Sequence, residues 1–292
     1  MGDRLWIMPN NDLEAKTIIE MLKKAGENVL STLQAWGASW EGLEDNIKAR
    51  IKEEILNNEN IKIYGIELQG EAPDNAKNID HHVYDEEDRS NNKSSIEQVA
   101  DLLGVKLTID EMFVAENDKG HISAMKALGA KLGMNEEEIN SIIDNIRRRD
   151  RETQGITKEQ EANAQEAINK LGEIEGKVSL ICVEIPESKC APITDGLYDK
   201  YDNLLIIGGD GETNFFGETE LINELNEKFP GGWSGGQLDK GSGFWGGYAD
   251  QNKIKDYIIN EFVKKDLPIR NSAGEPDRYN NTTNKEENDL EI

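Results

Sequence analysis

The fold predicted for this chain rests on two stretches, the segment Ile79-Asp80-His81-His82 and the apolar run IKIYGIEL at 61–68. The run is short, rich in isoleucine and bounded by Gly70 and Pro73, which predicts a buried strand. The Asp-His-His residues are expected at a strand-to-loop turn. A buried strand followed by a polar turn is typical of an α/β sheet with a ligand site at its edge.

Imidazole and carboxylate side chains gather around this turn. The three histidines of the chain are His81, His82 and His121, and the nearby acidic residues include Glu67, Asp74 and Asp118. Neutral imidazole together with carboxylate suits Zn, Mn, Fe or Co, and adjacent histidines can direct one ring at a metal and the other at its substrate. The alternative is a chance cluster on an acidic surface, because three-residue matches are common.

Strand and helix patterns alternate along the first half of the chain. Apolar runs predict strands at 5–8, 29–33 and 61–68, and helical spacing of apolar residues predicts helices over 15–24 and 43–56. This alternation predicts an α/β fold with a doubly wound, mainly parallel sheet, in which ligands gather at the carboxyl ends of strands. The polar residues expected at such ends are Asn10, Asp12, Glu67 and Asp80-His81-His82.

A chain of 292 residues is expected to hold two domains. Residues 1–155 form the expected metal-binding domain. Residues 156–175 have little apolar content and are interpreted as an exposed connecting helix. A smaller α/β domain for substrate binding is expected over 176–270, and the polar, acidic residues 271–292 are expected to be a disordered tail.

Composition excludes several classes of partner. The net charge of −25, from 58 acidic and 33 basic residues, repels phosphate backbones and anionic lipid, so no long nucleic acid is expected. A small phosphate-containing ligand can still bind where a metal or backbone amides reverse the local field. Two cysteines and the absence of a long apolar stretch predict a cytoplasmic protein without a membrane segment, and a homodimer is among the assemblies that we consider.

Glycine and aromatic residues alternate between 231 and 247, in the sequence GGWSGGQLDKGSGFWGG. Backbone amides freed by glycine can approach an anion closely, and Trp233, Phe244 and Trp245 can stack on a base or a sugar. The alternative is a tight loop whose aromatic side chains plug the interface between the two domains.

The order of these motifs resembles the DHH phosphoesterase superfamily, which includes RecJ-type exonucleases, nanoRNA and cyclic-dinucleotide phosphodiesterases and family II inorganic pyrophosphatases. The resemblance rests on Asp80-His81-His82 after the strand that carries Glu67, on Ser94-Ser95 at the start of a helix, and on Asp118. The glycine stretch resembles the C-terminal substrate-binding motif of that family, with Trp233 in place of the usual histidine.

The first motif of the family, His-x-Asn-Pro-Asp-x-Asp, corresponds here to WIMPNND at 6–12. Trp6 and Asn10 stand at two ligand positions, and neither replaces the expected ligand, so the resemblance implies that one of the two metal positions of the family is lost. The ligands of the other position are present as Asp12, Glu67, His81 and Asp118. Candidate ligands for an auxiliary ion are Asn10, Asp74 and His121. The expected metal is Mn, with Mg, Co and Zn as alternatives.

The resemblance implies a metal-dependent hydrolase that acts on a phosphoester or phosphoanhydride of a small phosphorylated or dinucleotide-type substrate. His82 would contact the scissile phosphate, and Asp80 would orient a ligand histidine. The expected substrate-binding residues are Arg147, Arg148, Gly231, Gly232, Trp233, Gly235 and Gly236. The alternative is a catalytically degenerate nucleotide-binding or scaffold protein, in which the loss of one metal has abolished a two-metal mechanism.

Overall fold

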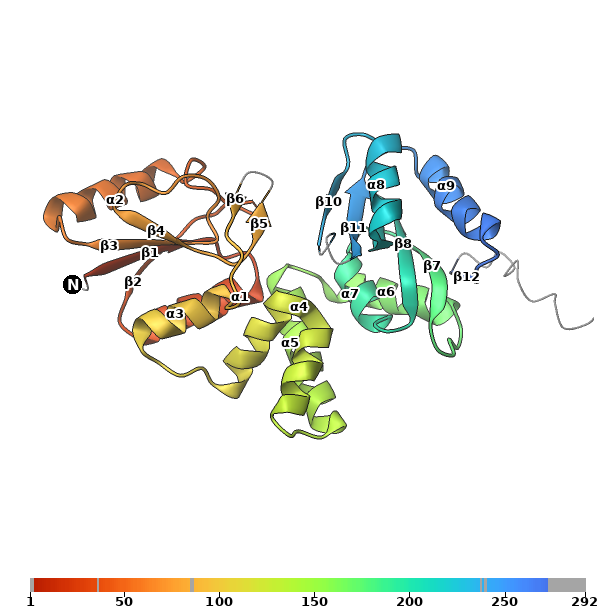
Figure 1. The fold of residues 1–292 in the computed structure, drawn as a ribbon, viewed down its shortest axis with the longest axis horizontal. Helices are drawn as coiled ribbons and strands as arrows, with labels where there is room; N and C mark the ends of the chain where they lie inside the picture. The colour runs from red at the N-terminus through yellow and green to blue at the C-terminus, as the bar shows by residue number, and fades with distance from the viewer. Residues whose placement is uncertain (1–2, 36, 85–86, 237, 239–240, 273–292) are drawn as a thin grey trace, which may run out of the picture. The chain divides into compact units, whose positions relative to one another are not determined.

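A computed structural model describes residues 3–35, 37–84, 87–236, 238 and 241–272 (Figure 1). The chain divides into two compact units, Met1–Gly155 and Ile156–Ile292. Each unit contains a sheet with helices on both faces, so the α/β fold predicted from the sequence is confirmed. No helix among the described residues is long and apolar enough to cross a bilayer.

The sheet of the first unit is parallel throughout. Its strands, in spatial order, are β2 (Asn28–Ser31), β1 (Arg4–Met8), β3 (Lys62–Ile66) and β4 (Ala76–Ile79). Helix α1 (Leu13–Lys24) connects β1 to β2, and helix α2 (Asp45–Asn57) lies between β2 and β3. The carboxyl ends of all four strands therefore lie at the same edge of the sheet.

Alternation along β1 explains the layered arrangement. Leu5 and Ile7 pack with Ile47 and Ile51 of α2 on one face. Side chains on the other face pack against α1 and α3 (Ser95–Leu103). Figure 1 shows α2 on one side of the sheet and α1 with α3 on the other. Because successive strand residues point to opposite faces, a strand that is apolar throughout must be covered on both, as the sequence predicted.

The polypeptide after β4 forms a short hairpin and three helices. The hairpin strands are β5 (Val83–Tyr84) and β6 (Glu87–Asp88), and α3 is followed by α4 (Ile109–Lys131) and α5 (Glu136–Thr153). Helix α4 is kinked at Gly120 and His121, whose backbone angles are not helical. The first part of α4 continues to this kink, which places Asp118 on a helix.

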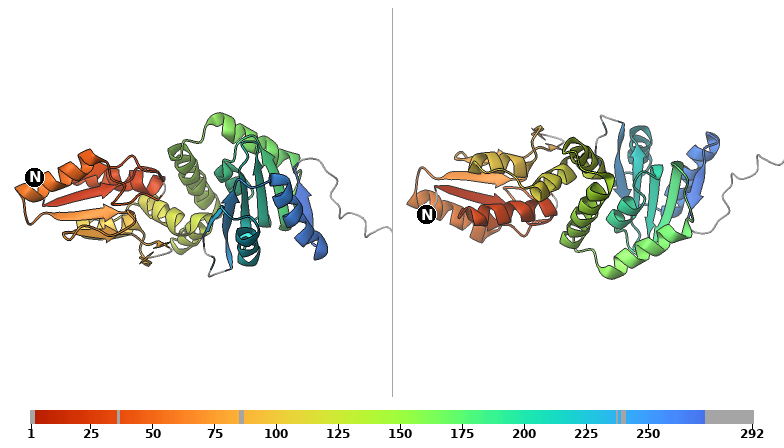
Figure 2. Two further views of the ribbon diagram at one scale, coloured as in Figure 1. Left: turned by 90° about the horizontal axis from the view of Figure 1, so that it is seen from above. Right: turned by 90° about the horizontal axis from the view of Figure 1, so that it is seen from below.

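The second unit has a mixed sheet of six strands. In spatial order these are β10 (Trp233–Gly235), β11 (Ser242–Gly247), β9 (Thr213–Glu218), β8 (Tyr201–Gly208), β7 (Val178–Ile185) and β12 (Ile269–Asn271). Helices α6 (Lys158–Lys170) and α7 (Cys190–Gly196) cover one face, and α8 (Thr219–Lys228) and α9 (Gln251–Lys264) cover the other. Figure 2 shows α6 and α8 on opposite sides of these strands.

Two expectations for the second unit need correction. Helix α6 is not exposed on all sides, because Ala164 and Ala167 on one of its faces pack against β7 and α7 in the core of this unit. Alanine contributes little to an apolar pattern, which is why the sequence suggested a solvated helix. Asn271 belongs to strand β12 and pairs with Cys182, so the polar tail does not begin at 271, and residues 273–292 lie outside the described part of the chain.

Candidate functional site

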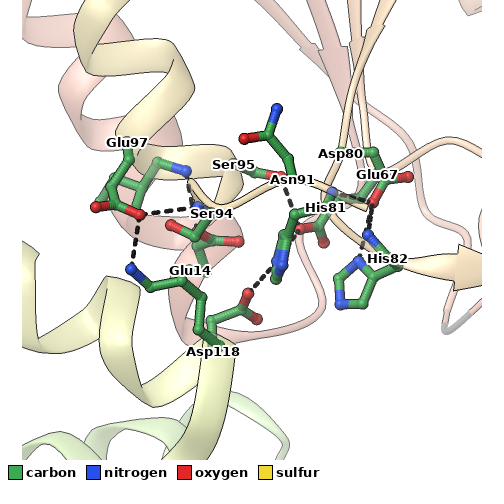
Figure 3. Close-up of polar contacts among 12 residues, drawn as sticks. Glu14, Glu67, Asp80, His81, His82, Asn91, Ser94, Ser95, Glu97 and Asp118 are labelled. Atoms are coloured by element: carbon green, nitrogen blue, oxygen red, sulfur yellow. Dashed lines mark hydrogen bonds and ion pairs between the residues drawn. The ribbon is translucent and has the colours of Figure 1, made fainter. Parts of the chain in front are cut away.

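Polar side chains converge at the carboxyl edge of the parallel sheet. Glu67 follows β3 directly and adopts a positive φ of 52°, while its backbone N–H donates to the Ile79 carbonyl at the end of β4. Asp80, His81 and His82 follow β4. Asp118 approaches from α4 (Figure 3). The site is therefore assembled from two strand ends and one helix.

Four of these residues form a group suited to a metal ion. Glu67, His81, His82 and Asp118 each offer one ligand atom, and these four atoms lie within 4.8 Å of one another. Nε2 of His81 lies 2.5 Å from Oδ2 of Asp118 and 4.0 Å from Oε1 of Glu67. The His81 ring is largely covered, with 8% of its side chain exposed.

The close pair of His81 and Asp118 is not a hydrogen bond. Despite the 2.5 Å separation, neither His81 Nε2 nor Asp118 Oδ2 has a hydrogen-bond partner of acceptable geometry among the described residues. A cation bound beside the pair would satisfy both buried atoms, which would otherwise cost free energy because neither has a partner. The residues present therefore fit a divalent metal ion.

Burial and mutual repulsion raise the pKa values of the surrounding carboxyl groups. Burial, followed by the charge of Glu67, raises the pKa of Asp12 to about 7. Burial, followed by Asp118, also raises the pKa of Glu67. Asp12 accepts a hydrogen bond of 2.8 Å from the backbone N–H of Ala15 and thereby caps α1. A bound cation would offset this repulsion and favour the ionised carboxylates.

Asp80 organises the Asp-His-His turn. Its buried Oδ1 accepts hydrogen bonds from the backbone N–H groups of His81 and His82, at 2.8 and 3.1 Å, and from Nδ1 of His82 at 2.9 Å. The bond to Asp80 is the main reason that the pKa of His82 rises to about 9. His82 is 40% exposed at its side chain, so this imidazole is held in place while one edge remains open to solvent.

Arg89 supports the same turn and was not recognised from the sequence. Its Nη1 donates to the carbonyl of Leu68 at 2.6 Å and lies 3.4 Å from Oδ2 of Asp80, and its Nη2 donates to the carbonyl of Gly70 at 2.8 Å. Arg89 therefore links Asp80 to the segment after β3. Nothing in a lone arginine followed by a polar stretch signals these contacts.

Glu14 is a second residue that sequence analysis missed. It lies in the first turn of α1, buried with the apolar residues Leu13, Ala15 and Ile18. A carboxylate within the buried face of an otherwise apolar helix was the signal in the sequence, because such groups are rarely buried without a partner.

The candidate auxiliary ligands do not join the four-residue group. Asn10 and Asp74 are exposed, and Asp74 lines a separate pocket beside α2. His121 lies at the kink of α4. Trp6 is fully buried, stacks on Tyr64 and donates its indole N–H to Glu27 at 2.8 Å. Trp6 is therefore a core residue.

The two predicted arginines both pair with side chains on α5, and Arg147 also bonds to α4. Arg147 is buried, and its Nη1 donates to Asp150 at 2.6 Å and to Asn117 at 2.9 Å. Arg148 is exposed and pairs with Glu152 at 2.7 Å. The bond to Asn117 identifies Arg147 as a residue that holds α5 to α4. The substrate-binding role expected from its charge does not account for its burial.

In the second unit, the glycine-rich stretch forms paired strands where we expected a loop. Strand β10 pairs with β11, and the segment between them contains Gly236 with a φ of 94°. Trp245 is fully buried in the core of the second unit, whereas Trp233 is 42% exposed and packs near Tyr248, with ring centroids 5.7 Å apart. Gly231, Gly232 and Trp245 help to line a cavity of about 270 Å³. Gly235 lies at the end of β10.

Comparisons with known proteins give one structural similarity. No protein-family model matches the chain, and no curated protein matches its sequence. Among solved structures, the chain is similar to the pGpG-specific phosphodiesterase PggH from Vibrio cholerae, at 13% sequence identity and a TM-score of 0.44, with 90% of this chain and 99% of that chain covered. The side chains of the site, and not this similarity, support the function proposed below.

Proposed function

We propose that this protein is a metal-dependent hydrolase of phosphoesters or phosphoanhydrides that acts on a small phosphorylated or dinucleotide-type substrate. The observation that carries the proposal is the group of Glu67, His81, His82 and Asp118, whose ligand atoms lie within 4.8 Å of one another. The order of motifs that resembles the DHH phosphoesterases supports the same activity. A cytoplasmic location and a homodimer stay predictions from the sequence.

Glu67, His81 and Asp118 would hold the metal, with Asp12 next to them. Mixed imidazole and carboxylate ligands favour Mn, with Mg, Co and Zn as alternatives. When bound, such an ion supplies Lewis acidity at a phosphoryl oxygen and lowers the pKa of water. The buried carboxylates near the site favour a cation over an anion there, so a substrate phosphate would bind only after the metal.

His82 would contact the scissile phosphate. Its hydrogen bond to Asp80 raises the pKa of His82 and favours the protonated ring, and with Nδ1 bonded to Asp80 the other nitrogen, Nε2, is the donor toward a substrate oxygen. Asp80, held by Arg89, fixes the orientation of this ring. Asp80 and Arg89 are thus positioning residues, while His82 would act on the substrate.

One observation favours a second candidate function, a catalytically inactive nucleotide-binding or scaffold protein. Trp6 occupies the position of a metal ligand in the family that the sequence resembles, and its ring is fully buried. The half-exposed Trp233 and its neighbouring glycines suit a flat ligand such as a base, whether the protein is a hydrolase or an inactive nucleotide-binding protein.

Hydrolysis of candidate substrates tests the proposal. Purified protein loaded with Mn is expected to release phosphate or mononucleotides from pyrophosphate, linear dinucleotides or cyclic dinucleotides, and a chelator should abolish this release. Binding of a dinucleotide without hydrolysis, in the presence of bound Mn, would instead favour the inactive nucleotide-binding protein.

The metal content of the protein is expected to be one tightly held divalent ion per chain. The described residues bring together a single group of imidazole and carboxylate ligands, and the auxiliary candidates lie elsewhere. Elemental analysis after Mn loading and extensive dialysis measures the ratio. Two retained ions per chain, or none, would contradict this expectation.

A further inference from the structure

The carboxyl group of Glu14 lies at the helix side of the metal-binding group (Figure 3). Its backbone is in the first turn of α1, and only 3% of the residue is exposed. Oε1 accepts a hydrogen bond of 2.9 Å from the backbone N–H of Ile96, at the start of α3. One oxygen is therefore anchored, and the carboxyl group has a fixed position.

The other oxygen of Glu14 has no such support. Oε2 is buried and finds no hydrogen-bond partner of acceptable geometry among the described residues. The carboxyl groups of Glu67 and Asp118 are close enough to repel the charge of Glu14. Two ionised carboxylates have no proton to donate, so Glu14 and Glu67 could form a hydrogen bond only if one of them were protonated. Lys119 on α4 pairs with Glu97 and Glu116.

An acidic residue at this position costs stability unless a cation is present. A buried carboxylate beside two others is destabilised by desolvation and by like charge, and both effects raise its pKa. Leucine or glutamine in the first turn of α1 would avoid this cost. The hydrogen bond from Ile96 does not explain the charge, because an amide oxygen accepts it equally well.

We propose that Glu14 is a further ligand of the divalent metal ion, with Oε2 as the ligating atom; this inference rests on the metal-binding part of the proposed function. Glu14 then adds a third carboxylate to those of Glu67 and Asp118. A ligand set richer in oxygen favours Mn or Mg over Zn, which strengthens the preference for Mn.

The variant Glu14→Gln tests this role because it preserves the shape of the side chain and the acceptor for Ile96. Titration of metal-free protein with Mn, followed by calorimetry, measures Kd, and thermal melts with and without Mn measure Tm. We expect the Kd for Mn to rise at least about tenfold, the scale of effects seen when metal-site residues are changed. We expect the Tm of the metal-free variant to equal or exceed that of the parent protein, since one repelling charge is removed.

Glu97→Gln is the matched control. Glu97 lies at the start of α3, but its carboxylate is already paired with the ammonium group of Lys119 at 2.9 Å, whereas Oε2 of Glu14 has no hydrogen-bond partner among the described residues. The Kd of Glu97→Gln for Mn should equal that of the parent protein.

Two results would overturn the role of Glu14. One is a Kd for Mn in Glu14→Gln equal to that of the parent. The other is a metal-free Tm well below that of the parent, or failure to fold, which would identify Glu14 as a structural residue. A parent protein that binds no Mn would refute the proposed function together with this inference, so the two failures are distinguishable.

Discussion

Replacing His81 by alanine is expected to remove the metal and, with it, all turnover. Nε2 of His81 lies between the carboxylates of Glu67 and Asp118, and its ring is largely covered, so no solvent-exposed group can take its place. We expect the Kd for Mn to rise by more than about tenfold. Replacing residues that only support the metal ligands already weakens metal affinity by about that factor, and loss of a ligand should cost more. Elemental analysis and calorimetric titration measure this loss.

His82→Ala should give the opposite pattern, with metal retained and turnover lost. The ring of His82 is bonded to Asp80 and open to solvent, which suits contact with a substrate. Removal of a group that donates a proton or hydrogen bond in the transition state costs about 10²- to 10⁴-fold in rate. If His82→Ala lost Mn as readily as His81→Ala, His82 would be a metal ligand. Its place in the four-residue group also permits that role.

The third histidine provides the control for both variants. His121 lies outside the group and has a positive φ of 57°, a conformation that glycine adopts without strain. His121→Gly therefore removes an imidazole without forcing the backbone, and both the Kd for Mn and kcat should remain at the values of the parent protein.

Trp245→Ala is expected to destabilise the second unit strongly. The indole is fully buried among the apolar residues of the core, and truncation of such a side chain costs about 3–5 kcal/mol. A loss of this size should lower the Tm of this unit by roughly 10 °C in a scanning calorimeter. Trp245→Phe, which keeps most of the apolar volume, should recover a large part of the loss.

Trp233→Ala should leave the same melting transition nearly unchanged. Trp233 is 42% exposed, and surface substitutions usually change the free energy of unfolding by less than about 0.5 kcal/mol. If Trp233 stacks on a base, this variant should instead weaken the binding of a dinucleotide. A fall in Tm as large as that of Trp245→Ala, with dinucleotide affinity intact, would identify Trp233 as a core residue.

Local patterns in the sequence predicted the fold class and several of the residues that meet at the edge of the sheet. The apolar run at 61–68 contains β3, and the run at 5–8 became β1, because a strand covered on both faces must be apolar at successive positions. Glu67 and His81 were found because polar residues after parallel strands meet at one edge of the sheet. Asp118 was found through the resemblance of motif order.

Neighbouring residues in the sequence did not predict how individual side chains are used. The glycine-rich stretch suggested a binding loop, yet its second half is a strand that buries Trp245, because strand pairing with β9 places this residue on the core face. Arg147 suggested an anion site, and its pairing with Asp150 and Asn117 depends on how α5 packs against α4.

The sequence by itself determined the parallel sheet of the first unit and the Asp-His-His turn at its edge, since both follow from the periodicity of apolar residues and from short-range turn chemistry. Only the tertiary structure placed the carboxyl group of Glu14 near those of Glu67 and Asp118. Its anchor is the backbone N–H of Ile96, 82 positions away, and its neighbours come from β3 and α4. Contacts between residues so distant in sequence depend on helix packing, which no local pattern encodes.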